Sequence, residues 1–586
     1  MMMSLAPPPP STKKAPSAKT SLKGGSSARR RKARVVKSLK PNEYATAVGG
    51  YADLPNGSGE NYIQLRDFLK TEPNVIQFPP HSYQDDFVIL YPLGPDENTA
   101  APPASSTLSR QAPSDSEADH DSMDERRHEA RRSIPFQDPH AFYRDSQNRN
   151  GPQSHIIFLR GYLSAAWIKN IGGGYFVDPE FFCRHLDFRP ANDSSNNFST
   201  PALPSTSWYL MELPVITIGM RSGPRGPLRT EKIEELRKQG AEALERHHGQ
   251  IAELSSSRMT EGESMIRDFY VFDETHFAVE QRISVCMQPA ESGDTFSLLV
   301  WLDSGADLPN DPPFPWSIQP PESHYFPTIL HRHMIALKGH LISSEDADPS
   351  ARSASHLPTD YGRSLHPAIM AGDAFYSLTE VISFAASSEM AFLNLLSAKL
   401  DRYTSLPAEQ YFQSLPNLKY VKQILGRHAR AVGQVLSSIR NAEHPRWPRD
   451  SSRRRAAETA ARGLEQDFAH LAERVGELHG RAAEAVAVLM SSVSISESQK
   501  AIEQAERVGK LTLMAFVFVP LSFTTSLFGM NVVELAGGKL GLKWWFAVSA
   551  PVTAAAVALY FVNVETLVRR VWTMLKSWWS EIGKLD

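Results

Sequence analysis

A row of small and hydroxylated side chains follows one face of an apolar segment near the C-terminus. Spaced three and four residues apart, as one face of an α-helix requires, this 508–529 row consists of Val508, Leu511, Ala515, Val519, Ser522, Ser526 and Gly529. The row is apolar at its first end and polar toward its last end, where it points at Asn531. Hydroxyl and amide oxygens are neutral acceptors, so this face could line a path for a polar solute. The plainer interpretation is that small residues let helices approach closely.

The row lies on the first of two apolar segments. Residues 511–528 form an uncharged run of 18 residues, about the shortest helix that crosses a bilayer. Residues 544–562 form a second apolar run. Together they predict a two-helix transmembrane hairpin over 511–562, with Gly529-Met530-Asn531 where the first helix leaves the hydrocarbon.

This arrangement resembles the CorA family of magnesium channels, whose signature is Gly-Met-Asn at the outer end of the first of two C-terminal transmembrane helices. The residues before the signature are similar too: Leu511-Thr512, Pro520-Leu521-Ser522-Phe523 and Phe528. The resemblance implies a homo-oligomer, pentameric in the family, with a pore lined by the first span. It also implies that cytosolic Mg²⁺ bound between subunits holds the gate shut, but no motif assigns those regulatory residues here.

Mg²⁺ dehydrates reluctantly, so its filter should offer neutral oxygens to a hydrated ion. Gly529, Met530 and Asn531 are therefore the expected selectivity filter, with the Asn531 amide meeting the hydrated ion. Rings of Val508, Leu511 and Val519 would form hydrophobic constrictions that close by dewetting.

Two departures from the family concern ion preference more than fold. Of the acidic stretch that family members often carry in the outer loop, only Glu534 remains to concentrate cations at the outer mouth. Ala505 stands where a polar Asn is often found below the gate.

The elements that position this hairpin precede it. Apolar runs at 155–162, 208–213, 215–218, 269–272, 282–287 and 296–302 predict strands, and a charged segment at 230–254 predicts a helix, which together indicate an α/β domain over 134–345. Asp178-Pro179-Glu180 predicts a helix start. Gly172-Gly173-Gly174 lacks a phosphate-binding pattern around it and predicts a loop.

From residue 366 to 510 the pattern is helical, with helices expected at about 367–403, 410–441 and 451–528. The last carries an a/d seam, the 464–489 seam: Leu464, Phe468, Leu471, Val475, Leu478, Ala482, Ala485 and Leu489. We expect this seam to pack on the two preceding helices, which leaves open that the stalk also packs on other copies.

Residues 1–133 read as a largely disordered basic tail and linker, although 43–95 allow a little structure. Residues 563–586 form a tail after the hairpin, and its Arg569, Arg570, Lys576 and Lys584 favour both termini on the cytosolic (or matrix) side. The net charge of −3 gives no general attraction to nucleic acid. We expect the plasma membrane, with the mitochondrial inner membrane or the vacuole as alternatives.

Other reactive residue types do not form a recognisable site. His331, His333 and His340 lack the spacing and partners of a metal site and, like His247-His248, are expected to be hydrated or locally hydrogen-bonded. Cys183 and Cys286 are expected to be small core residues. No nucleophile–base pair supports an enzyme, and we expect no cofactor besides Mg²⁺ as transported and regulatory ion.

The expected fold is therefore an α+β multi-domain membrane protein with an α/β domain, a long helical stalk and two C-terminal transmembrane helices. The expected function is passive transport of divalent cations, Mg²⁺ above all, through a homo-oligomeric pore. The alternative is a membrane-anchored coiled-coil interaction protein that has lost transport.

Overall fold

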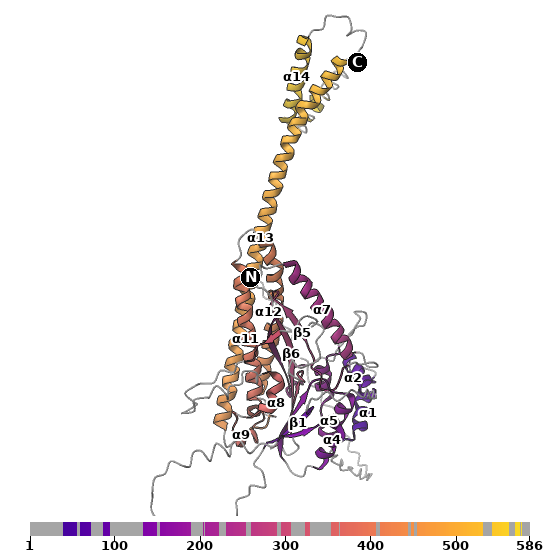
Figure 1. Ribbon diagram of the computed structural model, residues 1–586, viewed down its shortest axis with the longest axis vertical. Helices are drawn as coiled ribbons and strands as arrows, with labels where there is room; N and C mark the ends of the chain where they lie inside the picture. The colour runs from indigo at the N-terminus through magenta and orange to yellow at the C-terminus, as the bar shows by residue number, and fades with distance from the viewer. Residues whose placement is uncertain are drawn as a thin grey trace, which may run out of the picture.

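The computed structural model describes residues 39–54, 59–71, 86–93, 133–148, 153–188, 203, 205–221, 230–252, 259–289, 295–305, 323–328, 353–362, 364–405, 411–442, 447–449, 454–530, 542–561, 569–574 and 576. Figure 1 shows an α/β body at one end, from which a single long helix leads to a helical hairpin at the other end. The α/β body is the sheet together with the helices α1 to α12.

Eight strands form one mixed sheet inside the α/β body. They are β1 (Val88–Leu93), β2 (Ile134–Phe136), β3 (Ser154–Arg160), β4 (Leu210–Arg221), β5 (Asp268–Val271), β6 (His276–Pro289), β7 (Phe296–Leu302) and β8 (Ser323–Tyr325). Their order is β2-β1-β3-β7-β6-β4-β8, and β5 pairs with β6 outside this path. β3 and β7 are parallel, whereas the other described pairs are antiparallel.

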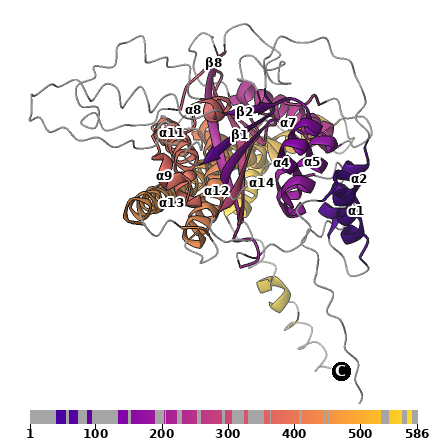
Figure 2. The same ribbon diagram turned by 90° about the horizontal axis from the view of Figure 1, so that it is seen from below.

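Helices cover both faces of the sheet (Figure 2). On one face lie α1 (Pro41–Ala52), α2 (Glu60–Lys70), α4 (Pro139–Asn148), α5 (Ala165–Tyr175) and α6 (Pro179–Leu186). On the other lie α8 (Leu357–Asp360), α9 (Pro367–Met370), α10 (Ala374–Ser377), α11 (Thr379–Thr404), α12 (Tyr411–Asn441) and the first half of α13 (Arg454–Gly529). α7 (Thr230–Ala252) packs on β5 and β6, and α14 (Leu542–Phe561) pairs with the end of α13.

Alternate residues of the central strands enter two separate cores. Phe158 and Val300 face the side covered by α9 to α13, whereas Leu159 and Trp301 face the side covered by α1, α2, α4, α5 and α6. Strands buried on both faces read as continuous apolar runs, which is why the sequence predicted them. The two runs predicted at 208–213 and 215–218 are one strand, β4, paired with β6 through Pro214.

The folded part begins earlier than the boundary expected at residue 134. β1 pairs with β3 along its whole length, and α1 and α2 bury Tyr44, Leu65 and Phe68 in the core under the sheet. The sequence around these elements is rich in Pro and polar residues, and the buried positions are few. Their burial depends on the sheet, which local periodicity does not reveal.

The triple glycine predicted as a loop instead ends helix α5. A Cβ on Gly172 would lie 2.3 Å from the Tyr44 ring, and one on Gly173 would lie 2.6 Å from the Leu39 carbonyl oxygen. The glycines are therefore needed because α1 packs directly on this helix, and Tyr44 also donates a hydrogen bond to the Val177 carbonyl.

The helix expected over 367–403 is three helices, α9, α10 and α11. α9 ends at Met370, and Asp373 begins the next helix. Its side chain accepts a hydrogen bond from the Tyr376 N–H and so caps the N-terminus of α10. The cap predicted at Asp178 is confirmed, with its carboxylate accepting from the Glu180 N–H at 2.9 Å. Cys183 and Cys286 are buried and free, as expected.

Two buried charge pairs fix α11 and α12 to the sheet. Lys399 of α11 donates to Asp273, in the turn between β5 and β6, at 2.5 Å. His428 of α12 contacts the Glu389 carboxylate of α11 at 2.9 and 3.1 Å and lies 3.7 Å from Glu280 of β6. Burial lowers the pKa of the His428 imidazole, but the Glu389 and Glu280 carboxylates outweigh it and raise that pKa to about 9.

We predict that Glu389→Gln destabilises the protein by about 3 kcal/mol at pH 6, because it leaves the buried imidazolium with only the more distant Glu280 carboxylate. A histidine whose folded pKa is raised contributes stability below its unfolded pKa of about 6.5 and loses it as the pH rises through about 9. Denaturant unfolding at pH 6 and pH 9.5 should therefore show a pH dependence that shrinks in the variant. Exposed Glu473→Gln is the control, and an unchanged pH dependence in Glu389→Gln would contradict the assignment.

Candidate ion pathway

Apart from Met530, which follows it directly, helix α13 carries the described residues of the candidate pathway. It runs without interruption for 76 residues, which is about 114 Å at 1.5 Å per residue. The sequence predicted one helix over 451–528, and the structure confirms it. Since Pro520 is the one proline in α13, little in the sequence opposes so long a helix.

The first half of α13 is held by the 464–489 seam. Its leucines, Phe468, Val475 and Ala482 are buried against α11 and α12, which confirms the expected packing on the two preceding helices. Beyond Leu489 the helix leaves the α/β body (Figure 1). Val488, next to this point, and Ile495 and Ile502 beyond it are spaced seven residues apart and are each about 60% exposed.

The second half of α13 pairs with α14. Ser549 donates to the Thr524 hydroxyl oxygen at 2.9 Å, and both side chains are buried. Phe516 packs on Tyr560 with ring centroids 5.5 Å apart. A Cβ added to Gly509 would lie 3.8 Å from the Tyr560 hydroxyl oxygen, so this glycine also faces α14. One face of α13, from residue 509 to 524, is therefore occupied by α14.

The 508–529 row lies on the opposite side of α13 from this contact. Along a helix at 100° per residue, its members cluster about 140° away from Gly509, Phe516 and Thr524, the positions that face α14. Every member is exposed in the chain, and Val508, Leu511 and Val519 are 60%, 66% and 65% exposed. The structure thus brings all seven residues to one surface that α14 does not cover.

The helix ends at the expected place. Gly529 is the last residue of α13, and the Met530 N–H donates to the Leu527 carbonyl at 3.4 Å. Asn531 and Glu534, the expected filter amide and outer-mouth carboxylate, lie outside the described residues. Their roles stay predictions.

By length and mean hydropathy, two described helices qualify as candidate membrane spans. One is α11, whose apolar window is 56% buried within the chain, as in a core helix. The other is Arg455–Gly529 of α13, whose window is 6% buried. α14 contains a shorter apolar helix, Leu542–Ala558, and exposes Trp544 and Phe546 near its start. Exposed aromatic residues are common at the ends of membrane-spanning helices.

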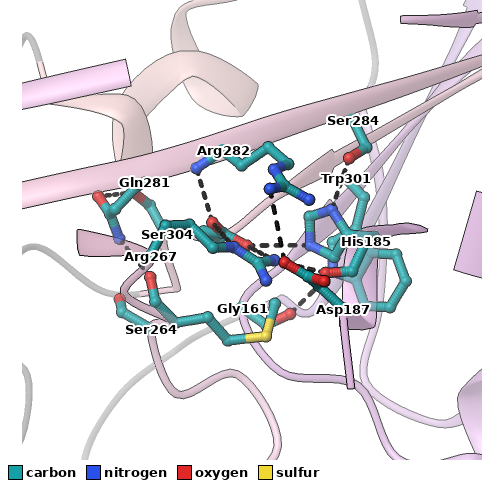
Figure 3. A network of polar contacts seen from close by, with 12 residues as sticks. Gly161, His185, Asp187, Ser264, Arg267, Gln281, Arg282, Ser284, Trp301 and Ser304 are labelled. Carbon is teal, nitrogen blue, oxygen red and sulfur yellow. Dashed lines mark hydrogen bonds and ion pairs between the residues drawn. The ribbon is translucent and has the colours of Figure 1, made fainter. Parts of the chain in front are cut away.

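A dense polar network in the α/β body is a second place to look for chemistry (Figure 3). Arg267 forms a fork on Asp303 at 2.6 and 2.7 Å, and Asp303 also accepts from the Arg282 N–H. His185 stacks on Trp301 and lies 2.8 Å from the Ser284 hydroxyl. Burial lowers the pKa of His185 to about 4, so the ring is neutral at pH 7. The network joins α6 to β6 and β7, and its His185, Arg267 and Asp303 side chains are buried.

No group of three His, Cys, Asp or Glu side chains that could hold a metal ion occurs within the described ranges. His247 accepts from the Ile266 N–H, and the His248 ring nitrogen lies 3.0 Å from the Ile266 carbonyl oxygen, so both contact the backbone of one residue in a segment distant in sequence. His331, His333 and His340 lie outside the described residues. Sequence reasoning missed His428 and Glu389, because residues 39 apart give no local signal.

Comparison with known proteins locates a family resemblance in the same part of the chain. Residues 406–570 match the family model described as CorA-like Mg²⁺ transporter protein, a range that contains α12, α13 and α14. The solved CorA magnesium transporter from Methanocaldococcus jannaschii is similar over 59% of this chain and 96% of that chain, at 13% sequence identity and a TM-score of 0.25. That TM-score is too low to equate individual elements. No curated protein matches the sequence.

We predict that Thr524→Val weakens the pairing of α13 and α14 by about 1 kcal/mol, because it removes the acceptor of the Ser549 hydroxyl. Thr525→Val is the matched control, since Thr525 is exposed and donates within its own helix, to the Leu521 carbonyl at 2.7 Å. Thermal unfolding in mild detergent should separate the two variants. Equal melting temperatures would show that the hydroxyl contact does not hold the helices together.

Proposed function

We propose that this chain is one subunit of a homo-oligomeric divalent-cation channel of CorA type, through which Mg²⁺ moves passively down its electrochemical gradient. The observation that carries the proposal is the position of the 508–529 row, exposed on the side of α13 that α14 leaves uncovered. The family match over 406–570 supports cation transport by the same helices. Two spans per chain cannot enclose an aqueous path, so a ring of subunits is required.

In such a ring, the ion passes the residues of the pathway in the order in which they follow one another along the chain. On the extracellular side (or its equivalent), Glu534 raises the local cation concentration and Asn531 offers a neutral oxygen to the hydrated ion. Ser526 and Ser522 present hydroxyls next. Val519, Leu511 and Val508 then form apolar rings, which conduct when wide enough to be wet and close by dewetting. Mg²⁺ keeps its inner water shell throughout, because the row holds no charged ligand.

The surface that joins subunits must lie outside the 464–489 seam, because that seam is buried within one chain. Val488, Ile495 and Ile502 supply an alternative, a seven-residue repeat of β-branched side chains on the exposed stalk. In this arrangement the stalks of neighbouring subunits contact one another between the α/β body and the membrane.

We predict that Ile495→Asp combined with Ile502→Asp lowers the fraction of assembled rings, because buried, unpaired carboxylates cost several kcal/mol. The folded body should survive, since both positions are exposed in the single chain. Native mass measurement in lipid provides the test, with exposed Glu497→Gln as the control. A wild-type protein that remains a monodisperse monomer in lipid would rule out the channel itself.

We predict that Asn531→Ala lowers Mg²⁺ flux at least tenfold, or about 1.4 kcal/mol in the barrier, because it removes the acceptor of a charge-assisted hydrogen bond. Insertion and assembly should persist, since the span keeps its length and hydrophobicity. Asn563→Ala, an amide beyond the other span, is the matched control. Dye-reported uptake into liposomes gives the readout.

Wild-type flux in an assembled Asn531→Ala protein would show that Gly529-Met530-Asn531 is a structural turn. Absence of flux in the wild-type protein, with normal assembly, would favour the alternative of a membrane-anchored interaction protein.

A further inference from the structure

The segment after α14 presents an amphipathic surface that the pore does not use. Residues 569–574 and 576 are helical, and all seven side chains are exposed. Trp572 is 70% and Val571 is 47% exposed. Figures 1 and 2 place this part of the chain away from the α/β body. A tryptophan so exposed on a helix is costly in water.

The helix separates basic from apolar residues. Arg569, Thr573 and Lys576 recur at spacings of four and three and share one face. At 100° per residue, Val571 lies on the opposite face, about 160° from both Arg569 and Thr573, and Trp572 lies at the boundary between the two faces, about 60° from Arg569 and 100° from Thr573. Thr573 donates to the Arg570 carbonyl at 2.8 Å, so its hydroxyl is satisfied within the helix. The printed sequence has no acidic residue between Glu565 and Glu581, and Trp578 and Trp579 follow.

This helix lies close to one end of the hairpin. α14 ends at Phe561, and its Tyr560 packs beside Phe516, near the point where α13 becomes apolar. Eight residue steps separate Phe561 from Arg569, a reach of at most about 29 Å. The basic and aromatic helix is therefore tethered within reach of the headgroup layer.

We propose that residues 569–576 form a membrane-surface helix, with Val571 and Trp572 inserted at the boundary of the acyl chains and Arg569 and Arg570 paired with anionic lipid headgroups. The inference rests on the membrane placement of the hairpin in the proposed function, but it does not require transport. Trp and aliphatic residues on one face with Lys and Arg on the other are the composition of helices that lie in the interface plane. Basic residues near the surface bind anionic lipids electrostatically.

The test compares two labelled variants of the full-length protein in vesicles. Val571→Cys and Thr573→Cys, on different faces of the helix, each receive an environment-sensitive fluorophore; native Cys183 and Cys286 are buried. Vesicles contain phosphatidylcholine alone or with phosphatidylserine. Quenching is measured with iodide on both sides of the bilayer and with a lipid that carries a nitroxide near its headgroup.

We expect the label at position 571 to be quenched by the nitroxide lipid and to be about threefold less accessible to iodide than the label at position 573, because only one face enters the lipid. Adding Arg569→Gln and Arg570→Gln should return iodide access at position 571 in vesicles with phosphatidylserine. Equal iodide access of the labels at positions 571 and 573 would overturn the proposal. Failure of the nitroxide lipid to quench either label would overturn it as well. Protection unaffected by the arginine substitutions would overturn its anionic-lipid part.

A third label separates this proposal from the proposed function. Val552 lies in α14 and is 40% exposed, so a label on Val552→Cys reports whether the hairpin itself is in the bilayer. If this label is in lipid while the label at position 571 is in water, the proposal of a membrane-surface helix is wrong, and the membrane placement of the hairpin is supported. If this label is also in water, the membrane placement in the proposed function is wrong.

Discussion

The burial of one face of α13 against α11 and α12 is the interaction on which the rest of the structure depends. A helix in hydrocarbon must satisfy its backbone hydrogen bonds internally, and an unbroken helix does so all the way from the α/β body to Gly529. The 464–489 seam fixes the direction and rotation of that helix before it leaves the body. Because a helix turns by 100° per residue, fixing its rotation at Leu489 also fixes which side the row from Val508 to Gly529 presents.

Charge pairs extend this rigidity into the sheet. Lys399 and Asp273, and His428 with Glu389, connect α11 and α12 to the strands β5 and β6 where few side chains reach solvent. Breaking one member of such a pair leaves the other charge buried, so these contacts resist separation of the layers. The sheet, the two supporting helices and the stalk are accordingly joined through both apolar and ionic contacts.

Periodicity explains which parts could be predicted from the sequence. The 464–489 seam repeats at the helix period, and β3, β6 and β7 contain continuous apolar runs, so each was recognisable locally. A little structure was expected over 43–95, but α1, α2 and β1 could not be predicted individually, because Tyr44, for example, packs on Gly172 and Phe182, more than a hundred positions away. Gly172 was assigned to a loop for the same reason, since the Tyr44 ring that requires it is distant in sequence. The row on α13 followed from spacing, but its relation to α14 required the contact of Thr524 with Ser549.

The exposed stretch of α13 between the α/β body and the hairpin has an electrostatic consequence. From Met490 to Lys510 the helix rises about 30 Å at 1.5 Å per residue. Physiological salt screens charges over about 8 Å, so this stretch spans nearly four screening lengths. With the hairpin in a membrane, as proposed above, the charged surface of α7 and the rest of the body would experience the ions of the bulk solution, and not the ion cloud that gathers at lipid headgroups. A composition change in the bilayer would then leave the field at the body nearly unaltered, while a change in the surrounding salt would reach it at full strength.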